Sequence, residues 1–329
     1  MTGPWPAVLA AVLALALSPP ASANAPADPA RAWLARSSPI VAADQAGRSV
    51  HVLRGDQSRW DADGEDRGVL WSWSADGQDE LSDLDPDSTW TNPSEAKLRE
   101  RGGRRYLLAT ASGGLAAVIG YPDRRVYWAA DTGSGNTHSI ELLPDGNVAV
   151  AASTGGYVRL YAASLGSRAT EHTQLDLPGA HGVHWDPHTR LLWALGSREL
   201  VALRVDGPSD DPGLTVLHRI TLPTRQGHDL AAVAGSPGRL WVTTASAVYQ
   251  FATKQRRFVS YPLQSRVSAP DVKSIGDDPV TGQILVARPE PGHACAWCTS
   301  TLTLYQPDGR RTLLHGAMYK ARWWAVGAR

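Results

Sequence analysis

The sequence has very little cysteine and no excess of charge of either sign. Two cysteines in 329 residues exclude a disulfide framework and any zinc fold built on several cysteine pairs. The 32 basic residues balance 32 acidic ones, so no basic surface is expected and we predict no nucleic-acid partner. Charged residues make up 19% of the chain and hydrophobic ones 43%, which excludes wholesale disorder.

Long apolar runs are also missing after residue 23, so no transmembrane anchor is expected in the mature chain. The one apolar run, Ala7 to Leu17, is too short to cross a bilayer but suits the core of a signal peptide. Ala21-Ser22-Ala23 then offers a small-residue cleavage site. We predict a signal peptide over residues 1–23 and a secreted or periplasmic protein. A buried apolar helix is the alternative.

Short apolar segments recur along the rest of the chain, and each follows a turn rich in Gly, Pro, Asp or Asn. Pro144-Asp145-Gly146-Asn147 precedes Val148–Ala152, and Asp186-Pro187-His188-Thr189 precedes Leu191–Leu195. Val, Leu, Trp and Tyr dominate these segments, as they do in β-strands. Helical periodicity is nearly absent, and Pro93 to Arg101 is the best helix candidate.

Six units share a short pattern at the start of a predicted inner strand, at intervals of about 43 to 48 residues. The units are Pro93-Ser94-Glu95-Ala96-Lys97, Thr137-His138-Ser139-Ile140-Glu141, Ala180-His181-Gly182-Val183-His184, Gly227-His228-Asp229-Leu230-Ala231, Ala269-Pro270-Asp271-Val272-Lys273 and Ala317-Met318-Tyr319-Lys320-Ala321-Arg322. This period suits a four-stranded propeller blade. We predict an all-β fold, a six-bladed β-propeller over residues 39–329, after an N-terminal extension at 24–38. Seven blades stay open if Gln78 to Arg101 forms an irregular one.

The first blade is expected to be split between the two ends of the chain. Its outer strands are predicted at Ile40–Ala43, Val50–Leu53 and Val69–Trp73, and its inner strand at Tyr319 to Ala325. Pairing both ends in one sheet removes the open edges of an incomplete ring.

The units Thr137–Ala151 and Gly179–Leu195 carry a likeness to known proteins. Each has a strand led by histidine, a turn of Pro, Asp or Gly and a second apolar strand. In these features the chain resembles the exported six-bladed propellers of the NHL, YVTN and gluconolactonase-like group. It is most similar to an uncharacterised bacterial family of secreted propellers. The resemblance implies the fold but no reaction, because the gluconolactonase-type metal site uses carboxylates and an amide where this chain has histidines.

Histidine leads the predicted inner strand in three successive units, at His138, His181 and His228. Inner strands of a propeller start at one mouth of the central channel, so these imidazoles are expected to converge. Together they can bind a divalent ion such as Zn, Mn or Ca, with Glu141 or Asp229 completing the ligand shell. Without a metal, one imidazole acts as a general base. Histidines that only hydrogen-bond the backbone are the alternative.

Charged residues on the same strands are assigned to catalysis or to substrate binding. Lys273 and Arg322 join the three histidines as catalytic residues that hold an anionic substrate. The substrate-binding positions are Glu95, Lys97, Asp229, Asp271, Tyr319 and Lys320. A uronic acid suits this set, because a cation acidifies the proton beside its carboxylate and a base removes that proton. Oligogalacturonate lyases place a histidine-bound metal in a propeller mouth, and the chain is similar to them in kind.

These residues predict an exported enzyme that acts on a carbohydrate or another anionic small molecule, with elimination preferred over hydrolysis. The alternative is a non-catalytic propeller that binds a glycan or a protein of the cell envelope. A monomer is expected in both cases.

Cys295 and Cys298 lie in an insertion of the sixth unit, after Pro291-Gly292. Haem attachment requires histidine directly after the second cysteine, and Thr299 stands there. In an exported protein the pair is predicted to form a local disulfide.

Tryptophan is abundant, with 13 residues. We expect five of them, which fall inside apolar strands, to pack between blades: Trp71, Trp73, Trp128, Trp193 and Trp241. Four others lie nearer the predicted mouths or loops and are candidates for stacking on sugar rings: Trp90, Trp185, Trp297 and Trp323.

Overall fold

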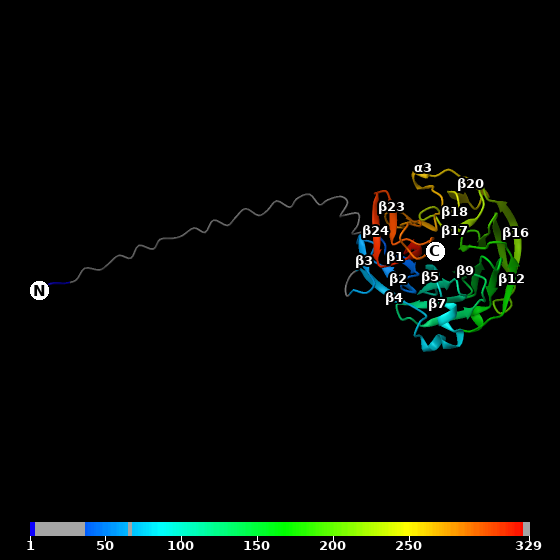
Figure 1. Ribbon diagram of the computed structural model, residues 1–329, viewed down its shortest axis with the longest axis horizontal. Helices are drawn as coiled ribbons and strands as arrows, with labels where there is room; N and C mark the ends of the chain where they lie inside the picture. The colour runs from blue at the N-terminus through cyan, green and yellow to red at the C-terminus, as the bar shows by residue number, and fades with distance from the viewer. Residues whose placement is uncertain (4–36, 65–67, 325–329) are drawn as a thin grey trace.

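The computed structural model describes residues 1–3, 37–64 and 68–324. Residues 4–23 of the predicted signal peptide and 24–36 of the predicted extension lie outside the described residues. Within this part of the chain, six β-sheets stand around a central axis, each with its innermost strand nearest that axis (Figure 1). The prediction of a six-bladed β-propeller is confirmed.

Blade 1 joins the two ends of the described chain, as predicted. Its inner strand is β25 (Met318–Trp323), followed outward by β1 (Ile40–Asp44), β2 (Ser49–Leu53) and β4 (Val69–Trp73). The short strand β3 (Arg59–Asp61) leaves this blade and pairs in parallel with the outer strand of blade 6.

The other blades run from an inner to an outer strand in chain order. Blade 2 has β5 (Pro93–Arg101), β6 (Arg104–Ala111), β7 (Leu115–Tyr121) and β8 (Val126–Asp131), and blade 3 has β9 (Thr137–Leu142), β10 (Val148–Ala152), β11 (Tyr157–Tyr161) and β12 (His172–Asp176). Blade 4 has β13 (Gly182–Asp186), β14 (Leu191–Leu195), β15 (Glu199–Asp206) and β16 (Gly213–Thr221). Blade 5 has β17 (Gly227–Ala232), β18 (Arg239–Thr244), β19 (Val248–Ala252) and β20 (Arg257–Val259), and blade 6 has β21 (Ser274–Asp277), β22 (Ile284–Ala287), β23 (Thr301–Tyr305) and β24 (Gly309–Leu314).

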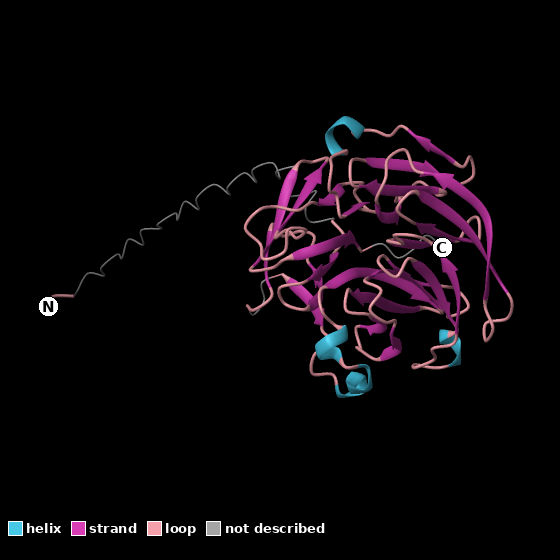
Figure 2. Cartoon of the chain, turned by 45° about the vertical axis from the view of Figure 1, so that its right-hand side comes forward, coloured by secondary structure: helices cyan, strands magenta, loops and turns pink. Residues whose placement is uncertain are grey.

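The helix predicted at Pro93 to Arg101 is wrong, because this segment is β5. Its Glu, Ala, Lys, Leu and Arg residues are good helix formers, but pairing with β6 overrides that preference. Ala96 and Leu98 then share one buried face of the strand. The described helices are short and lie at the outside of the ring (Figure 2). They are η1 (Asp79–Leu84), α2 (Pro86–Thr89), η2 (Ala163–Leu165) and α3 (Gln264–Val267), and Gln78 to Arg101 adds no seventh blade. None of them is long and apolar enough to cross a bilayer.

Apolar side chains fill each boundary between neighbouring blades. The cluster between blades 2 and 3, for example, packs Trp128 and Val118 against Ile140 and Val150. All five strand tryptophans named above are buried in such clusters, as predicted. Trp90 is fully buried as well and donates its indole N–H to the Arg48 carbonyl at 2.7 Å, so it does not face a mouth.

Cys295 and Cys298 form the predicted disulfide in the loop between β22 and β23. The bond closes a very short loop, so chain entropy limits its contribution to stability to about 2 kcal/mol. We expect the double variant Cys295→Ser, Cys298→Ser to lose at most this much unfolding free energy in a urea titration. Reducing agent should shift the wild type equally and leave the double variant unchanged, and a larger loss would contradict this local role.

Candidate functional site

Each blade presents one residue to the axis where its inner strand starts. In four blades this residue is the extra one of a β-bulge: Ser94, His138, His228 and Tyr319. A bulge redirects the side chain that it carries. His181 and Lys273 take the same place just before β13 and β21, where their backbone N–H groups donate to Leu195 and Ala287. We call these six residues the histidine ring.

The structure brings the three histidines of this ring together. The ring centroids of His138 and His181 are 4.6 Å apart, and those of His181 and His228 are 4.8 Å apart. Tyr319 continues the row, 5.5 Å from His138. Lys273 ends it, because its Nζ lies 3.0 Å from His228 Nε2. One mouth of the channel therefore carries imidazoles, a phenol and an ammonium group in mutual contact.

The environment keeps these imidazoles neutral. Burial first, and then neighbouring imidazoles and lysines, hold the pKa of His138 well below its usual value and lower that of His228 to about 2. Burial lowers the pKa of His181 to about 4. The Nδ1 atoms of His138 and His181 lie 3.0 Å from backbone carbonyls, so they carry the hydrogen and leave Nε2 as an acceptor.

Metal binding by this ring stays a prediction. Among the described residues, no group of three or more His, Cys, Asp or Glu side chains is arranged to hold a metal ion. Lys273 approaches the Nε2 atom of His228 that a metal would need. Glu141, the expected further ligand, is three residues from His138 on the same strand, about 10 Å along it, and pairs with Arg99 instead.

Asp271 corrects the predicted register of blade 6. This residue is exposed on the loop before β21, and Lys273 takes the ring position three residues later than the alignment predicted. The alignment failed because Val272 is buried between blades, as Ile140 is, and imitates the apolar position of the pattern.

Beneath the ring, positions one and three residues further along the inner strands hold a buried ionic cluster. Arg322 of blade 1 donates two hydrogen bonds to Glu95 of blade 2, at 2.9 and 3.0 Å. It donates two more to Asp229 of blade 5, at 2.6 and 3.1 Å. Blades 2 and 5 lie on opposite sides of the ring, so this one guanidinium spans the channel.

Two lysines complete the cluster. Lys97 donates to Ser139 Oγ and to the backbone carbonyls of Ile140 and Val183, at 2.9, 3.1 and 2.8 Å. Lys320 donates to the His138 carbonyl at 3.1 Å. Burial lowers the pKa of Lys97 to about 8. Burial opposes ionisation of Glu95, but Arg322, Lys320 and Lys97 outweigh it and hold the Glu95 pKa well below its usual value.

Substrate binding by residues of this cluster stays a prediction. Glu95, Asp229 and Lys320 are fully buried, and Lys320 contacts both carboxylates. Lys97 and Arg322 are 2% and 8% exposed, and both line a pocket at the opposite mouth of the channel. The cluster closes the channel and separates its two mouths.

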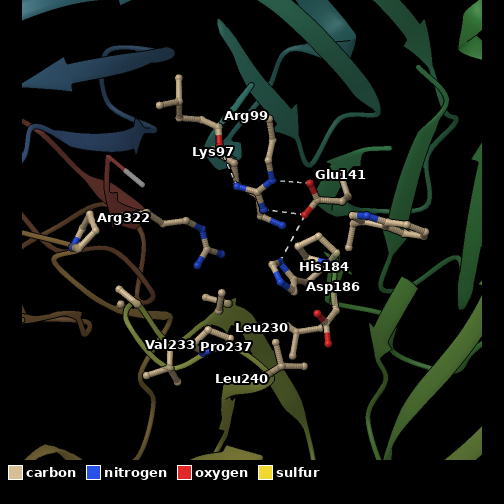
Figure 3. Close-up of a pocket in the computed structure, with 18 of the residues that line it drawn as sticks. Lys97, Arg99, Glu141, His184, Asp186, Leu230, Val233, Pro237, Leu240 and Arg322 are labelled. Atoms are coloured by element: carbon tan, nitrogen blue, oxygen red, sulfur yellow. Dashed lines mark hydrogen bonds and ion pairs between the residues drawn. The ribbon is translucent and has the colours of Figure 1, made fainter. Parts of the chain in front are cut away.

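The opposite mouth contains a pocket of about 570 Å³, where the inner strands end (Figure 3). Glu141 lies on its polar wall and receives two hydrogen bonds from Arg99, one of them 2.6 Å long. His184 Nδ1 lies 3.6 Å from the second oxygen of Glu141. Neither Arg99 nor His184 was identified as a site residue from the sequence. His184 occupies the same position of its inner strand as Glu141 and Arg322 do in theirs. Arg99 comes two residues after Lys97, which has this position in blade 2. These positions were the signal in the sequence.

Two of the four candidate tryptophans contribute to this pocket. Trp185 and Trp323 line it, whereas Trp297 is 46% exposed in the disulfide loop. Stacking on a sugar ring by these residues stays a prediction.

Residues 34–327 match the model of a family described as "Family of unknown function (DUF6528)". The chain belongs to this family. No curated protein matches it. This DUF6528 propeller resembles a crystal structure of a protein of unknown function from Bacteroides caccae, with 12% identity, a TM-score of 0.52, and coverage of 87% of this chain and 98% of that one.

A second solved structure is virginiamycin B lyase from Staphylococcus aureus. It shares 12% identity with the DUF6528 propeller over 69% of this chain and 85% of that one, with a TM-score of 0.46. The Bacteroides likeness supports the fold alone, and the lyase likeness carries no argument about the site. Membership of the NHL, YVTN and gluconolactonase-like group stays a prediction.

Proposed function

We propose that the protein is an exported enzyme that eliminates a leaving group from a small anionic substrate, such as a uronate, at the histidine ring. The observation that supports this most directly is the contact between Lys273 and His228, beside the stacked imidazole of His181. A cation that binds a carboxylate then stands beside a base that removes the adjacent proton. The local disulfide is compatible with an oxidising compartment.

The chemistry needs only side chains of the ring. The Lys273 ammonium turns from His228 to the substrate carboxylate, which frees Nε2 of His228. This nitrogen takes the proton beside the carboxylate, and the C–H electron pair forms the C=C double bond as the C–O bond to the leaving group breaks. The imidazolium then gives its proton to the departing oxygen, and the histidine is neutral again.

The test is turnover of digalacturonate and polygalacturonate, followed by the ultraviolet absorbance of the new double bond. We expect His228→Gln to lower kcat/KM by about 100-fold or more, because a general base contributes at least that much. Lys273→Met should lower kcat/KM as well, because it removes the cation that binds the substrate carboxylate. The control is His172→Gln, since His172 is exposed on the outer strand β12 and should leave turnover unchanged.

Each other outcome is informative. Unchanged turnover in both His228→Gln and Lys273→Met would show that the histidine ring takes no part in the reaction. Binding of digalacturonate to the wild type without product, lost in Lys273→Met, supports the non-catalytic alternative. A wild type that neither binds nor converts uronates contradicts the proposed substrate class.

A further inference from the structure

We propose that the pocket at the strand-end mouth is a second binding site, which takes a small neutral molecule with a flat apolar body and one weakly acidic hydroxyl, such as a phenol. It lies across the buried ionic cluster from the histidine ring. The inference does not depend on the proposed elimination.

The pocket exists because two inner strands carry very small residues at one position. Four blades place Lys97, Glu141, His184 and Arg322 there, each third after the ring residue. Blades 5 and 6 have Ala231 and Gly276 at this position. A Cβ atom built on Gly276 meets no atom within 4 Å, so the space beside it is open. The pocket is therefore displaced from the axis towards blades 5 and 6.

The displaced side of the pocket is apolar. Blade 5 supplies Leu230, Val233, Pro237 and Leu240, and blade 6 supplies Ile275. Figure 3 shows Leu230, Val233, Pro237 and Leu240 gathered on one side and Arg99, Glu141 and Lys97 on the other. Such a wall favours a flat apolar group by burial and dispersion. A volume of about 570 Å³ lies within the usual range for small-molecule sites.

The polar side offers an acceptor at His184. The two hydrogen bonds from Arg99 fix the Glu141 carboxylate, which faces His184 Nδ1 at 3.6 Å. The nearby carboxylate favours the tautomer with the hydrogen on Nδ1, which has a lone pair on Nε2. Burial lowers the pKa of His184 despite Glu141, which keeps the imidazole neutral. No protein group in the described chain hydrogen-bonds Nε2, so this atom can accept a proton-donating hydroxyl.

The charges on the wall argue against an anionic ligand. The Arg322 guanidinium is saturated by Glu95 and Asp229, and Arg99 is held by Glu141. Lys97 donates its three N–H groups to Ser139 and two backbone carbonyls. Arg101 and Arg239 also line the pocket and donate to the backbone carbonyls of Pro144 and Asp145 and to Gln250. An anion bound next to Lys97, Arg99 and Arg322 would therefore lose its hydration without gaining a free cation from these three, which is costly in a buried site. A neutral hydroxyl avoids this cost.

The probe for this site is 4-nitrophenol, measured by calorimetry below its own pKa, where it is neutral. We expect saturable binding to the wild-type protein. His184→Leu, which removes the acceptor but keeps an apolar surface, should weaken binding about tenfold, the effect of one hydrogen bond in a desolvated site. Gly276→Phe should abolish binding, because the ring fills the open space in ordinary strand backbone. His172→Gln is the matched control and should bind as the wild type does.

A second ligand tests the charge argument. 4-Nitrobenzenesulfonate has a similar body and a permanent negative charge, and it should bind at least about tenfold more weakly. Absence of 4-nitrophenol binding, or equal affinity in Gly276→Phe, would overturn the site. Tighter binding of the sulfonate would overturn the neutral-ligand class, and full affinity in His184→Leu would overturn the acceptor. Folding of each variant is checked by its urea midpoint, and none of these readouts depends on uronate turnover.

Discussion

Arg322→Met should lower the unfolding free energy by about 3–5 kcal/mol, the usual cost of removing one partner from a buried ion pair. The variant leaves Glu95 and Asp229 without the four hydrogen bonds that Arg322 donates to them. Both carboxylates are fully buried, so water cannot replace the lost partner. A urea titration followed by tryptophan fluorescence measures the loss.

The matched control is Arg204→Met. Arg204 also pairs with a carboxylate, Asp206, but its side chain is 53% exposed, and we expect a change of about 0.5 kcal/mol or less. Adding Glu95→Gln and Asp229→Asn to Arg322→Met should recover part of the loss, because the uncompensated charges are then gone. Equal, small effects of Arg322→Met and Arg204→Met would show that the cluster does not hold the blades together.

Acid should destabilise the protein well before ordinary carboxylates titrate. In the unfolded chain His181 and His228 take up protons near their usual pKa of 6.5, whereas the folded state keeps them neutral to about 4 and about 2. Between these values the unfolded state binds more protons, so the unfolding free energy falls as the pH falls, by up to about 1.4 kcal/mol per pH unit for each imidazole. Glu95 and Glu141, whose folded pKa values are depressed, add a further loss below 4.5.

Urea midpoints measured between pH 6.5 and 4 check this slope. His228→Gln removes one of the neutral imidazoles and should flatten the curve, whereas His172→Gln should leave it unchanged. A wild-type midpoint that stays constant over this interval would contradict the burial of neutral imidazoles at the histidine mouth.

Most of the fold could be predicted from the sequence because the pattern repeats. Blades of one length place equivalent residues at equivalent heights, so a column of His138, His181 and His228 predicts neighbours in space. The observed centroid separations follow from that equivalence. The same reasoning found the closure by β25, because the first outer strands lacked an inner partner nearby in the chain.

The features that the sequence did not reveal depend on contacts between opposite blades and on a glycine that leaves space open. The partners of Arg322 lie on two opposite blades, and only the ring geometry shows that Glu95 and Asp229 are both within its reach. The second pocket depends on Gly276, which looks like an ordinary strand residue until the space beside it is seen. The position of Lys273 depends on where β21 begins. The alignment placed this start too early, because Val272 is apolar and buried like the apolar residue of the pattern.

Blades 1 and 6 exchange strands in both directions. The last strand, β25, completes blade 1, while β3 leaves the neighbourhood of blade 1 to extend blade 6 beside β24. Among the described residues, neither β25 nor β3 is held only by neighbours from its own part of the chain, because each pairs with a strand from the opposite part. The propeller can therefore open between blades 1 and 6 only if strands of both sheets separate together, and not by the fraying of one terminal strand.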